Sequence, residues 1–374
     1  MNPDAEPGNL QELISSARAM RALMQSDPHR PTYHFVAPEG YAFPFDPNGA
    51  LYWKGKYHLG FIYQKRPTRE YSPDSGHVWG HAVSTDLLHW SLYPDMLNVT
   101  EGDRETGIFS GGAFISKEGV PHLIYHGLGA AANLLAYAAD DDLRIWTKVA
   151  NPALTAEAVP SETCSVSDPC AWYDASSDCY YQISGGMKPG LFKSKDLHEW
   201  EYLGNAISGE DTLRHSFEDV ACPDFFTVGN KSMLLFISHA LGAQYYLGEF
   251  ANDRFTSEQH GRMNWSGGSF FAIEQLRDAR GRSIIWGWIT QHHKPPHLRD
   301  YGWSGVMSLP RVISLDDAGV LQINPPEEIE RIRLQETPEA DILMQANQEA
   351  TLRANGRSIE LKIEIASGSR SPRK

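Results

Sequence analysis

Between about residues 33 and 320, the apolar side chains of this chain gather in short runs that polar turns separate. Two such turns are residues 54–56 (KGK) and 229–231 (GNK). Short apolar runs bounded by glycine-containing turns are typical of β-strands, and no long helical periodicity interrupts them. Strands are therefore predicted at residues 50–53, 57–63, 123–125, 179–183, 233–237, 245–250 and 283–289.

A short phrase repeats along this region. The phrase STDLLHW ends at Trp90 and a related phrase, SKDLHEW, ends at Trp200, while weaker copies end at Trp146 and Phe255. The steps between the three tryptophans are 56 and 54 residues, a spacing typical of repeat architectures. About five such units fit the region, and each has room for four short strands. The pattern predicts an all-β, five-bladed β-propeller; a large β-sandwich is the runner-up, which the regular repeat disfavours.

The two ends of the chain follow other patterns. Residues 1–30 carry apolar side chains at helical spacing, which predicts an amphipathic N-terminal helix before a propeller at residues 31–325. Residues 326–374 begin as a linker with helical content and then alternate apolar and polar side chains at 359–365, as a half-buried strand does. That strand has no sequence left to pair with, so we expect the start of a truncated C-terminal β-sandwich domain.

Composition and charge narrow the class of partner. The net charge of −14 argues against nucleic acid and against anionic membrane surfaces, both of which attract basic patches. Aromatic residues make up 11% of the chain, with ten Trp and sixteen Tyr, and flat rings pack well in β-structure and on the faces of sugars. We therefore expect a neutral small molecule or sugar as ligand, with the oligomeric state left open.

Targeting signals and cysteine spacing add little to this picture. No apolar stretch approaches the length of a transmembrane helix and no signal peptide is visible, so we expect a cytoplasmic protein. The four cysteines, at positions 164, 170, 179 and 222, show neither a zinc-type pair nor a dense disulfide framework. They are interpreted as reduced thiols, and no metal site is expected.

Three turns that open successive blades carry carboxylates. They lie at Asp46, at Asp168 and in the segment 218–224. Because the first strand of each blade lines the channel of a propeller, these carboxylates could converge there. Convergent carboxylates suit cleavage of a glycosidic bond, in which one stays ionised to attack and another is kept protonated by burial. Asp-Pro sequences are also ordinary turns, but their register with the blades favours the functional interpretation.

Several runs, in order along about residues 30–335, resemble glycoside hydrolase family 32, the family of invertases, levanases, inulinases and fructan exohydrolases. The runs that carry the resemblance are residues 30–35, 46–49, 52–59, 79–84, 109–111, 168–169, 222–224, 270–272, 281–288 and 302–311. The resemblance implies a five-bladed propeller followed by a β-sandwich, which agrees with the repeat.

The resemblance also implies a chemistry, a retaining double displacement on a β-fructofuranosyl unit without a metal or organic cofactor. Asp46 resembles the nucleophile that forms the fructosyl-enzyme intermediate, and Asp168 resembles the residue that stabilises the transition state. Phe109 and Ser110 resemble the wall of the fructose pocket, and Trp288 resembles its aromatic side.

The chain departs from the family pattern at several positions near these residues. Phe45 precedes the candidate nucleophile where the family usually has Asn, and Gln64 is only a shifted counterpart of a family substrate-binding residue. Ser167 stands where the family usually has Arg, so a guanidinium that would hold the sugar is missing.

The most serious departure concerns the general acid/base. The family has Glu directly before Cys-Pro-Asp, and this chain has Ala221, which cannot donate a proton. Glu218 is our first candidate for a relocated acid, because it has the reach if the strand entry bulges. Glu274 and Asp219 are alternatives, the latter on the same strand face as Ala221. A chain without any acid remains a fourth alternative.

These observations predict a retaining glycoside hydrolase, β-fructofuranosidase-like, acting on sucrose, fructo-oligosaccharides or fructans. A fructosyltransferase would use the same intermediate with a sugar hydroxyl in place of water. A propeller that binds fructosides without catalysis is the alternative from another class, and the alanine at position 221 favours it. A related propeller hydrolase acting on arabinosides or xylosides fits the motifs less well.

Overall fold

The computed structural model describes most residues of the chain. They are residues 11, 14–15, 18–19, 22–23, 25–31, 33–35, 46–64, 76–159, 163–207, 218–265, 269–290, 303, 305–339, 341–356 and 358–365.

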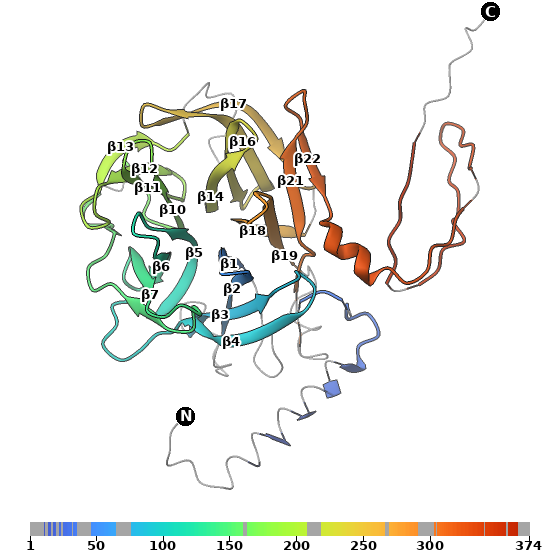
Figure 1. Ribbon diagram of the computed structural model, residues 1–374, viewed down its shortest axis with the longest axis horizontal. Coiled ribbons are helices and arrows are strands. Elements are labelled where there is room, and N and C mark those ends of the chain that lie inside the picture. Colours follow the sequence, from blue (N-terminus) through green and yellow to red (C-terminus); the bar gives the residue numbers. More distant parts are fainter. Residues whose placement is uncertain are drawn as a thin grey trace, which may run out of the picture.

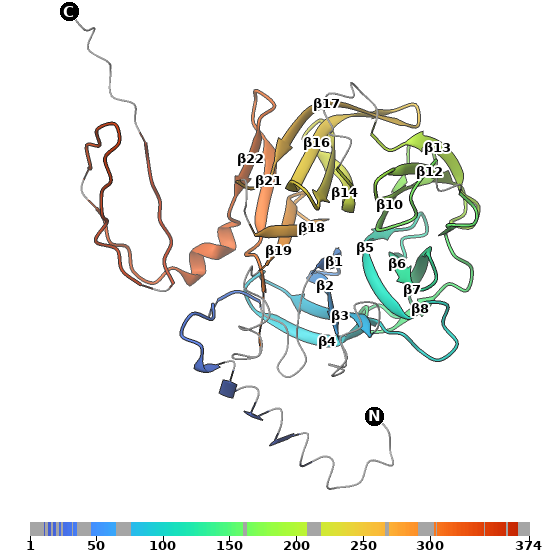
Figure 2. The same cartoon turned by 180° about the vertical axis from the view of Figure 1, so that it is seen from behind.

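Within these residues, five antiparallel sheets are arranged as blades around a central axis (Figures 1 and 2). Blade 1 contains β1 (Pro47–Trp53), β2 (Lys56–Gln64), β3 (His77–Ser84) and β4 (Trp90–Leu97). Blade 2 contains β5 (Gly107–Ile115), β6 (Pro121–Leu128), β7 (Ala132–Ala138), β8 (Trp146–Lys148) and β9 (Leu154–Thr155). Blade 3 contains β10 (Pro169–Asp174), β11 (Cys179–Ser184), β12 (Gly190–Ser194) and β13 (Glu201–Asn205). Blade 4 contains β14 (Ala221–Val228), β15 (Lys231–Ser238), β16 (Gly242–Ala251) and β17 (Arg254–Arg262). Blade 5 contains β18 (Phe270–Arg277), β19 (Ser283–Ile289), β20 (Val306–Met307), β21 (Arg311–Leu315) and β22 (Leu321–Asn324). The predicted all-β, five-bladed propeller is confirmed, and every run predicted as a strand between residues 50 and 289 lies in one.

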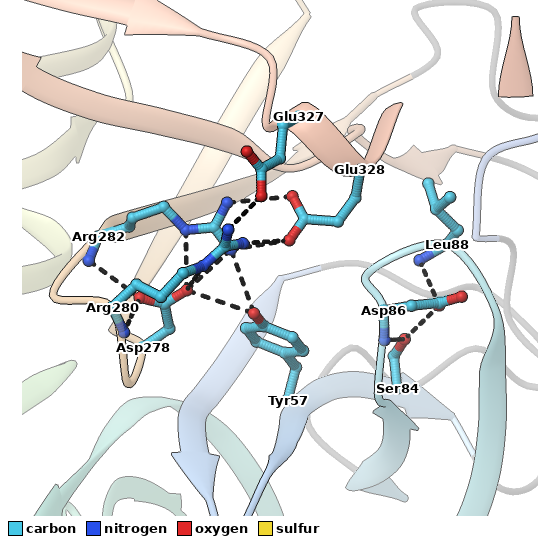
Figure 3. Close-up of polar contacts among 9 residues, drawn as sticks. All are labelled: Tyr57, Ser84, Asp86, Leu88, Asp278, Arg280, Arg282, Glu327 and Glu328. Atoms are coloured by element: carbon cyan, nitrogen blue, oxygen red, sulfur yellow. Dashed lines mark hydrogen bonds and ion pairs between the residues drawn. The ribbon is translucent and has the colours of Figure 1, made fainter. Parts of the chain in front are cut away.

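The repeated phrase forms the tight turn before the outer strand of blades 1 to 3. In blade 1, Asp86 Oδ1 accepts a hydrogen bond from the backbone amide of Leu88 at 3.0 Å (Figure 3). It also accepts one from the His89 amide at 2.9 Å. Asp196 makes equivalent bonds in blade 3. Leu87, with φ of 66°, adopts the left-handed conformation that the turn requires. The repeat therefore encodes a turn that the carboxylate holds, as the chain enters the outer strand.

A separate apolar cluster fills each boundary between neighbouring blades. In β6, Leu123 and Tyr125 pack against blade 1, whereas Ile124 between them packs against blade 3. This division follows because alternate residues of a strand point to opposite faces of its sheet. The five inner strands contact one another in chain order around the axis, and β18 meets β1 to complete the ring.

Four of the inner strands contain a bulge near their first residues. The register shifts lie at Asn48/Leu51, Ile108/Gly111, Ala221/Asp224 and Phe271/Glu274. A bulge places two residues of one strand opposite one of its partner and re-aims a side chain. In β1 the bulge requires Gly49, since its φ is 56° and an added Cβ would lie 3.0 Å from a ring carbon of Trp79.

A buried ion cluster joins blades 5 and 1 (Figure 3). Arg282 donates to Asp278 Oδ2 at 2.8 Å, to Glu328 Oε1 at 2.9 Å and to the Tyr57 hydroxyl at 3.2 Å. Arg280 pairs with Glu328 from the exposed side. Because Tyr57 lies in blade 1 and Glu328 follows blade 5, the cluster connects the two ends of the propeller sequence.

The segment after the propeller is helical only at its start. The 3-10 helix η2 (Glu327–Ile332) agrees with the helical content predicted for the linker. Residues 333–339, 341–356 and 358–365 form no strand, so the strand predicted at 359–365 is absent there. The physical reason is that alternation alone cannot form a strand, because its backbone groups need a neighbouring strand, and apolar side chains of this segment are exposed. The limits of the predicted sandwich domain stay a prediction.

The N-terminal segment touches the propeller at one described point. Its described residues between 11 and 26 are helical, and the amphipathic character expected of this helix stays a prediction. The buried Asp27 accepts a hydrogen bond from Trp303 Nε1 at 3.1 Å, between β19 and β20. The domain boundary at residue 30 stays a prediction. No helix in the described part of the chain is long and apolar enough to cross a membrane.

Candidate active site

Asp46 lies immediately before β1, the inner strand of blade 1, and its backbone is fixed from two sides. Its carbonyl oxygen accepts from Asn48 Nδ2 at 2.7 Å and from the Ile62 amide of β2 at 3.0 Å. The side-chain oxygen of Asn48 accepts from the Gly111 amide of β5 at 2.8 Å. Asn48 therefore ties blade 1 to blade 2 directly beside Asp46, a role that the turn sequence alone did not reveal.

Three other blades bring polar groups to the Asp46 carboxylate. Ser110, in the bulge of β5, donates its hydroxyl to Asp46 Oδ2 at 2.7 Å. Cys222 Sγ, in the bulge of β14, lies 3.6 Å from Asp46 Oδ2 and 3.7 Å from Asp168 Oδ2. The Cys222 amide also donates to Asp168 Oδ2 at 3.0 Å. The two carboxylates predicted as nucleophile and stabiliser thus converge from blades 1 and 3 on one thiol of blade 4.

The environment of Asp46 favours its protonated form more than water does. Burial raises its pKa from the ordinary 3.8 to about 6, and the nearby charge of Asp168 acts in the same direction. The hydrogen bonds from Ser110 and Cys222 oppose this rise, because they stabilise the ionised carboxylate. Asp46 is therefore ionised above about pH 6, which is the state that a nucleophile requires.

Two further carboxyls, Glu274 of β18 and Asp224 of β14, belong to inner strands. Glu274 Oε1 accepts from the Ala50 amide, four residues along β1 from Asp46, at 2.9 Å. Burial raises the pKa of Glu274 well above its ordinary value, and the charge of Asp224 adds to the rise. Burial also raises the pKa of Asp224 to about 7, against a hydrogen bond from the Gln275 amide. Glu274 can hold a proton at neutral pH, but its carboxyl is bound to the backbone of blade 1.

Glu218 faces away from the position that Ala221 occupies. Val220 belongs to the apolar cluster between blades 3 and 4, whereas Ala221 belongs to the cluster between blades 4 and 5. Alternation along the strand entry places Glu218 on the face of Val220. Its Oε1 accepts from Gln244 Nε2 of β16 at 2.6 Å, and the residue is 1% exposed. This hydrogen bond joins Glu218 to β16 of its own blade.

Asp219 is bound to a histidine that the sequence analysis did not consider. Asp219 Oδ1 accepts from the His239 amide at 2.8 Å, and Oδ2 lies 2.5 Å from His239 Nδ1. His239 follows β15, and Ala221 pairs with Ile237 across the two strands. The register of these two strands is the signal that could have found the pair, because continuing it outward by two residues brings positions 219 and 239 opposite each other.

The predicted substrate-binding residues lie at three other places. Phe109, in the bulge of β5, is partly exposed, and its ring lies 5.6 Å from that of His77. Trp288 of β19 is partly exposed and packs on Gly305, where an added Cβ would lie 2.2 Å from the indole nitrogen. Gln64 ends β2, and its side chain lies outside the described residues. Contact of these residues with a sugar stays a prediction.

All four cysteines are free thiols, as predicted from their spacing, and three of them are buried. Within the described ranges, no group of three or more His, Cys, Asp or Glu side chains is placed to hold a metal ion.

Comparison with known proteins finds relatives that cover most of this chain. The sucrose-6-phosphate hydrolase of Zymomonas mobilis is 28% identical over 381 residues, which cover 93% of this chain and 72% of the relative. The fructan 6-exohydrolase of Beta vulgaris is 28% identical over 357 residues, which cover 83% of this chain and 56% of the relative. The solved fructan 1-exohydrolase IIa of Cichorium intybus is 25% identical, with a TM-score of 0.69 over 83% of this chain and 63% of its own.

This chain therefore spans less than two thirds of the length of the Cichorium intybus and Beta vulgaris enzymes. The family model described as the glycosyl hydrolases family 32 N-terminal domain matches residues 34–325, which begin shortly before β1 and end after β22. The chain belongs to glycosyl hydrolases family 32.

Proposed function

We propose that this chain is a retaining glycoside hydrolase that cleaves β-fructofuranosyl linkages in sucrose, fructo-oligosaccharides or fructans. The observation that carries the proposal is the convergence of Asp46 and Asp168 on Cys222, with contacts of 3.6 and 3.7 Å. The names of the relatives support the substrate class, and so do two solved neighbours, one bound to 1-kestose and one bound to sucrose.

The proposed reaction begins with attack on the anomeric carbon. Asp46, ionised above about pH 6, attacks C2 of the fructosyl unit and forms a covalent ester as the glycosidic C–O bond breaks. The Ser110 hydroxyl fixes the attacking carboxylate in one rotamer. The Asp168 carboxylate stabilises the positive charge that develops at C2 and the ring oxygen. Water then attacks C2 from the side that the leaving group vacated, so the configuration at C2 is retained.

Ala221 favours a second candidate, a propeller that binds fructosides without turning them over. Its methyl group is buried and offers no proton to a leaving alkoxide. Transfer of the fructosyl unit to a sugar hydroxyl differs from hydrolysis only in the acceptor.

The test is release of fructose from sucrose, 1-kestose, inulin and levan by the purified chain, with Asp46→Asn as the matched inactive variant. Release by the unaltered chain and none by Asp46→Asn supports the hydrolase. Chromatography of the products separates hydrolysis from transfer. Calorimetric binding of 1-kestose without release of fructose would replace the hydrolase with the binding propeller.

A further inference from the structure

The start of blade 4 lacks an acid at Ala221, but it carries an ionisable pair two residues away. Ala221 of β14 pairs with Ile237 of β15, and both belong to the apolar cluster between blades 4 and 5. Cross-strand neighbours share a face, and residues two apart along a strand also share a face. Asp219 and His239 extend this register outward, so they lie on the Ala221 face, at the edge of the cluster.

The imidazole of His239 lies beside Phe271, which in turn neighbours Trp288, the predicted aromatic side of the pocket. Its ring centroid is 5.6 Å from that of Phe271 in an edge-on arrangement, and Phe271 lies 6.4 Å from Trp288. Phe271 is the last residue before the bulge of β18, and Ala221 holds the same position in β14. Because β14 and β18 are adjacent inner strands, the imidazole lies at the rim between Ala221 and Trp288.

The state of His239 suits exchange of protons with a ligand. Its side chain is 68% exposed, and Nδ1 is held 2.5 Å from Asp219 Oδ2. This contact leaves Nε2 directed away from Asp219 and open to a substrate. A carboxylate on one ring nitrogen orients an imidazole and stabilises its protonated form.

We propose that His239, oriented by Asp219, is the general acid and base of this glycosidase in place of the missing glutamate. The proposal rests on the proposed function, because it supplies the proton that cleavage by Asp46 requires. Glu218 points to the opposite face of the strand, and Glu274 is bound to the Ala50 amide. Neither carboxyl is therefore an exposed proton donor on the strand face that Ala221 occupies.

In the proposed reaction, Nε2 of His239 first donates a proton and then takes one back. As Asp46 attacks C2, the electron pair of the glycosidic bond passes to the leaving oxygen, which takes the proton from the imidazolium Nε2. The neutral imidazole then removes a proton from water as the water oxygen attacks C2. The ester bond breaks, its electron pair returns to the Asp46 carboxylate, and the imidazolium is restored.

In the described part of the chain, the groups that contact the His239 ring come from the entry of β14 and from β18. Asp219, at the entry of β14, is the charged group in contact with it, and Phe271 faces it from β18 without a charge. The carboxylate of Asp219 is therefore the group that orients the imidazole.

The test uses a leaving group that needs no proton. We expect His239→Ala to slow hydrolysis of sucrose by about 10²–10⁴-fold, the range of general acid catalysis. With 4-nitrophenyl β-fructofuranoside the variant should keep its burst of nitrophenolate, because nitrophenolate leaves unprotonated. The slow second step should then be accelerated by azide, an anion that attacks C2 without a base.

The matched control is His89→Ala. His89 also holds its Nδ1 against an aspartate, Asp86, at 2.8 Å, but in the outer turn of blade 1. This variant should hydrolyse sucrose and release nitrophenolate at the rates of the unaltered chain. Sucrose hydrolysis by His239→Ala within about threefold of the unaltered chain would overturn the proposal. So would the leaving-group signature in Glu218→Gln or Glu274→Gln instead.

Asp219 is a positioning residue, and its test compares two leaving groups. Asp219→Asn should lower kcat for sucrose while its release of nitrophenolate stays close to that of the unaltered chain, because the imidazole loses the carboxylate that orients Nε2. An unchanged kcat for sucrose would overturn its assigned role. Absence of any nitrophenolate release from the unaltered chain would instead defeat the proposed function, so the two failures are distinguishable.

Discussion

The hydroxyl of Ser110 lies 2.7 Å from Oδ2 of Asp46 and donates to it from the bulge of the neighbouring blade. Ser110 is fully buried, so this bond does not exchange with water. The carboxylate is destabilised by burial and by Asp168, and the hydroxyl partly offsets both effects. The packing of blade 2 against blade 1 therefore sets the pH at which the candidate nucleophile becomes ionised.

Replacing Ser110 with alanine should move the acid limb of the activity profile. The pKa of Asp46, about 6 with the bond in place, should rise without it, because the hydrogen bond favours the ionised form. We expect kcat/KM for sucrose to fall at mildly acidic pH and to recover as the pH rises. The control is Ser116→Ala, a buried serine in the turn after β5, and its profile should match that of the unaltered chain.

Replacing Asp46 with asparagine should stabilise the fold at neutral pH. Since the folded-state pKa of about 6 lies above the ordinary 3.8, the folded chain binds the extra proton, and stability falls as the pH rises through this window. The shift corresponds to about 3 kcal/mol above the window, and asparagine removes that cost.

Urea unfolding at about pH 8 and about pH 3.5 measures the effect, which should vanish at the lower pH, where both states are protonated. Asp141→Asn, at an exposed ion pair with Lys54, is the surface control and should change stability little. Equal stability of Asp46→Asn and the unaltered chain at about pH 8 would contradict the pKa of Asp46.

Two arginines of the ion cluster that joins blades 5 and 1 should differ in how much they stabilise the fold. Arg282→Ala leaves Asp278 and Glu328 buried without their main cation and should cost about 3–5 kcal/mol in the free energy of unfolding. Arg280 is about half exposed, so Arg280→Ala should cost less than about 1 kcal/mol. Chemical denaturation of both variants checks the difference. Similar losses in the two variants would show that burial does not decide the strength of these pairs.

Glutamate at position 221 should compensate for the loss of His239. In a His239→Ala background, we expect Ala221→Glu to restore part of the sucrose hydrolysis, because a carboxyl would again lie on this face of blade 4. Adding a side chain at this buried site costs about 1–3 kcal/mol in stability, so thermal unfolding is measured in parallel. A folded double variant that releases nitrophenolate but no fructose from sucrose would contradict the assigned face.

Local rules were enough to predict much of the fold. The turn around Asp86 repeats at a fixed spacing, and the spacing gives the number of blades. Strand alternation gave the wrong result at residues 359–365, which pair with no other strand in the described part of the chain. Alternation describes the two faces of a strand, whereas pairing depends on a neighbour that the pattern does not identify.

Residue type and register with the blades were enough to propose Asp46 and Asp168 from sequence, because an inner strand brings its first residues to the axis. Only the tertiary structure decided the environment of those carboxylates and the faces of Glu218 and Asp219. The Ser110 and Cys222 contacts join residues 64 and 176 positions away from Asp46. Such distances, and the burial that shifts a pKa, depend on how blades pack against one another, and no local sequence pattern contains that information.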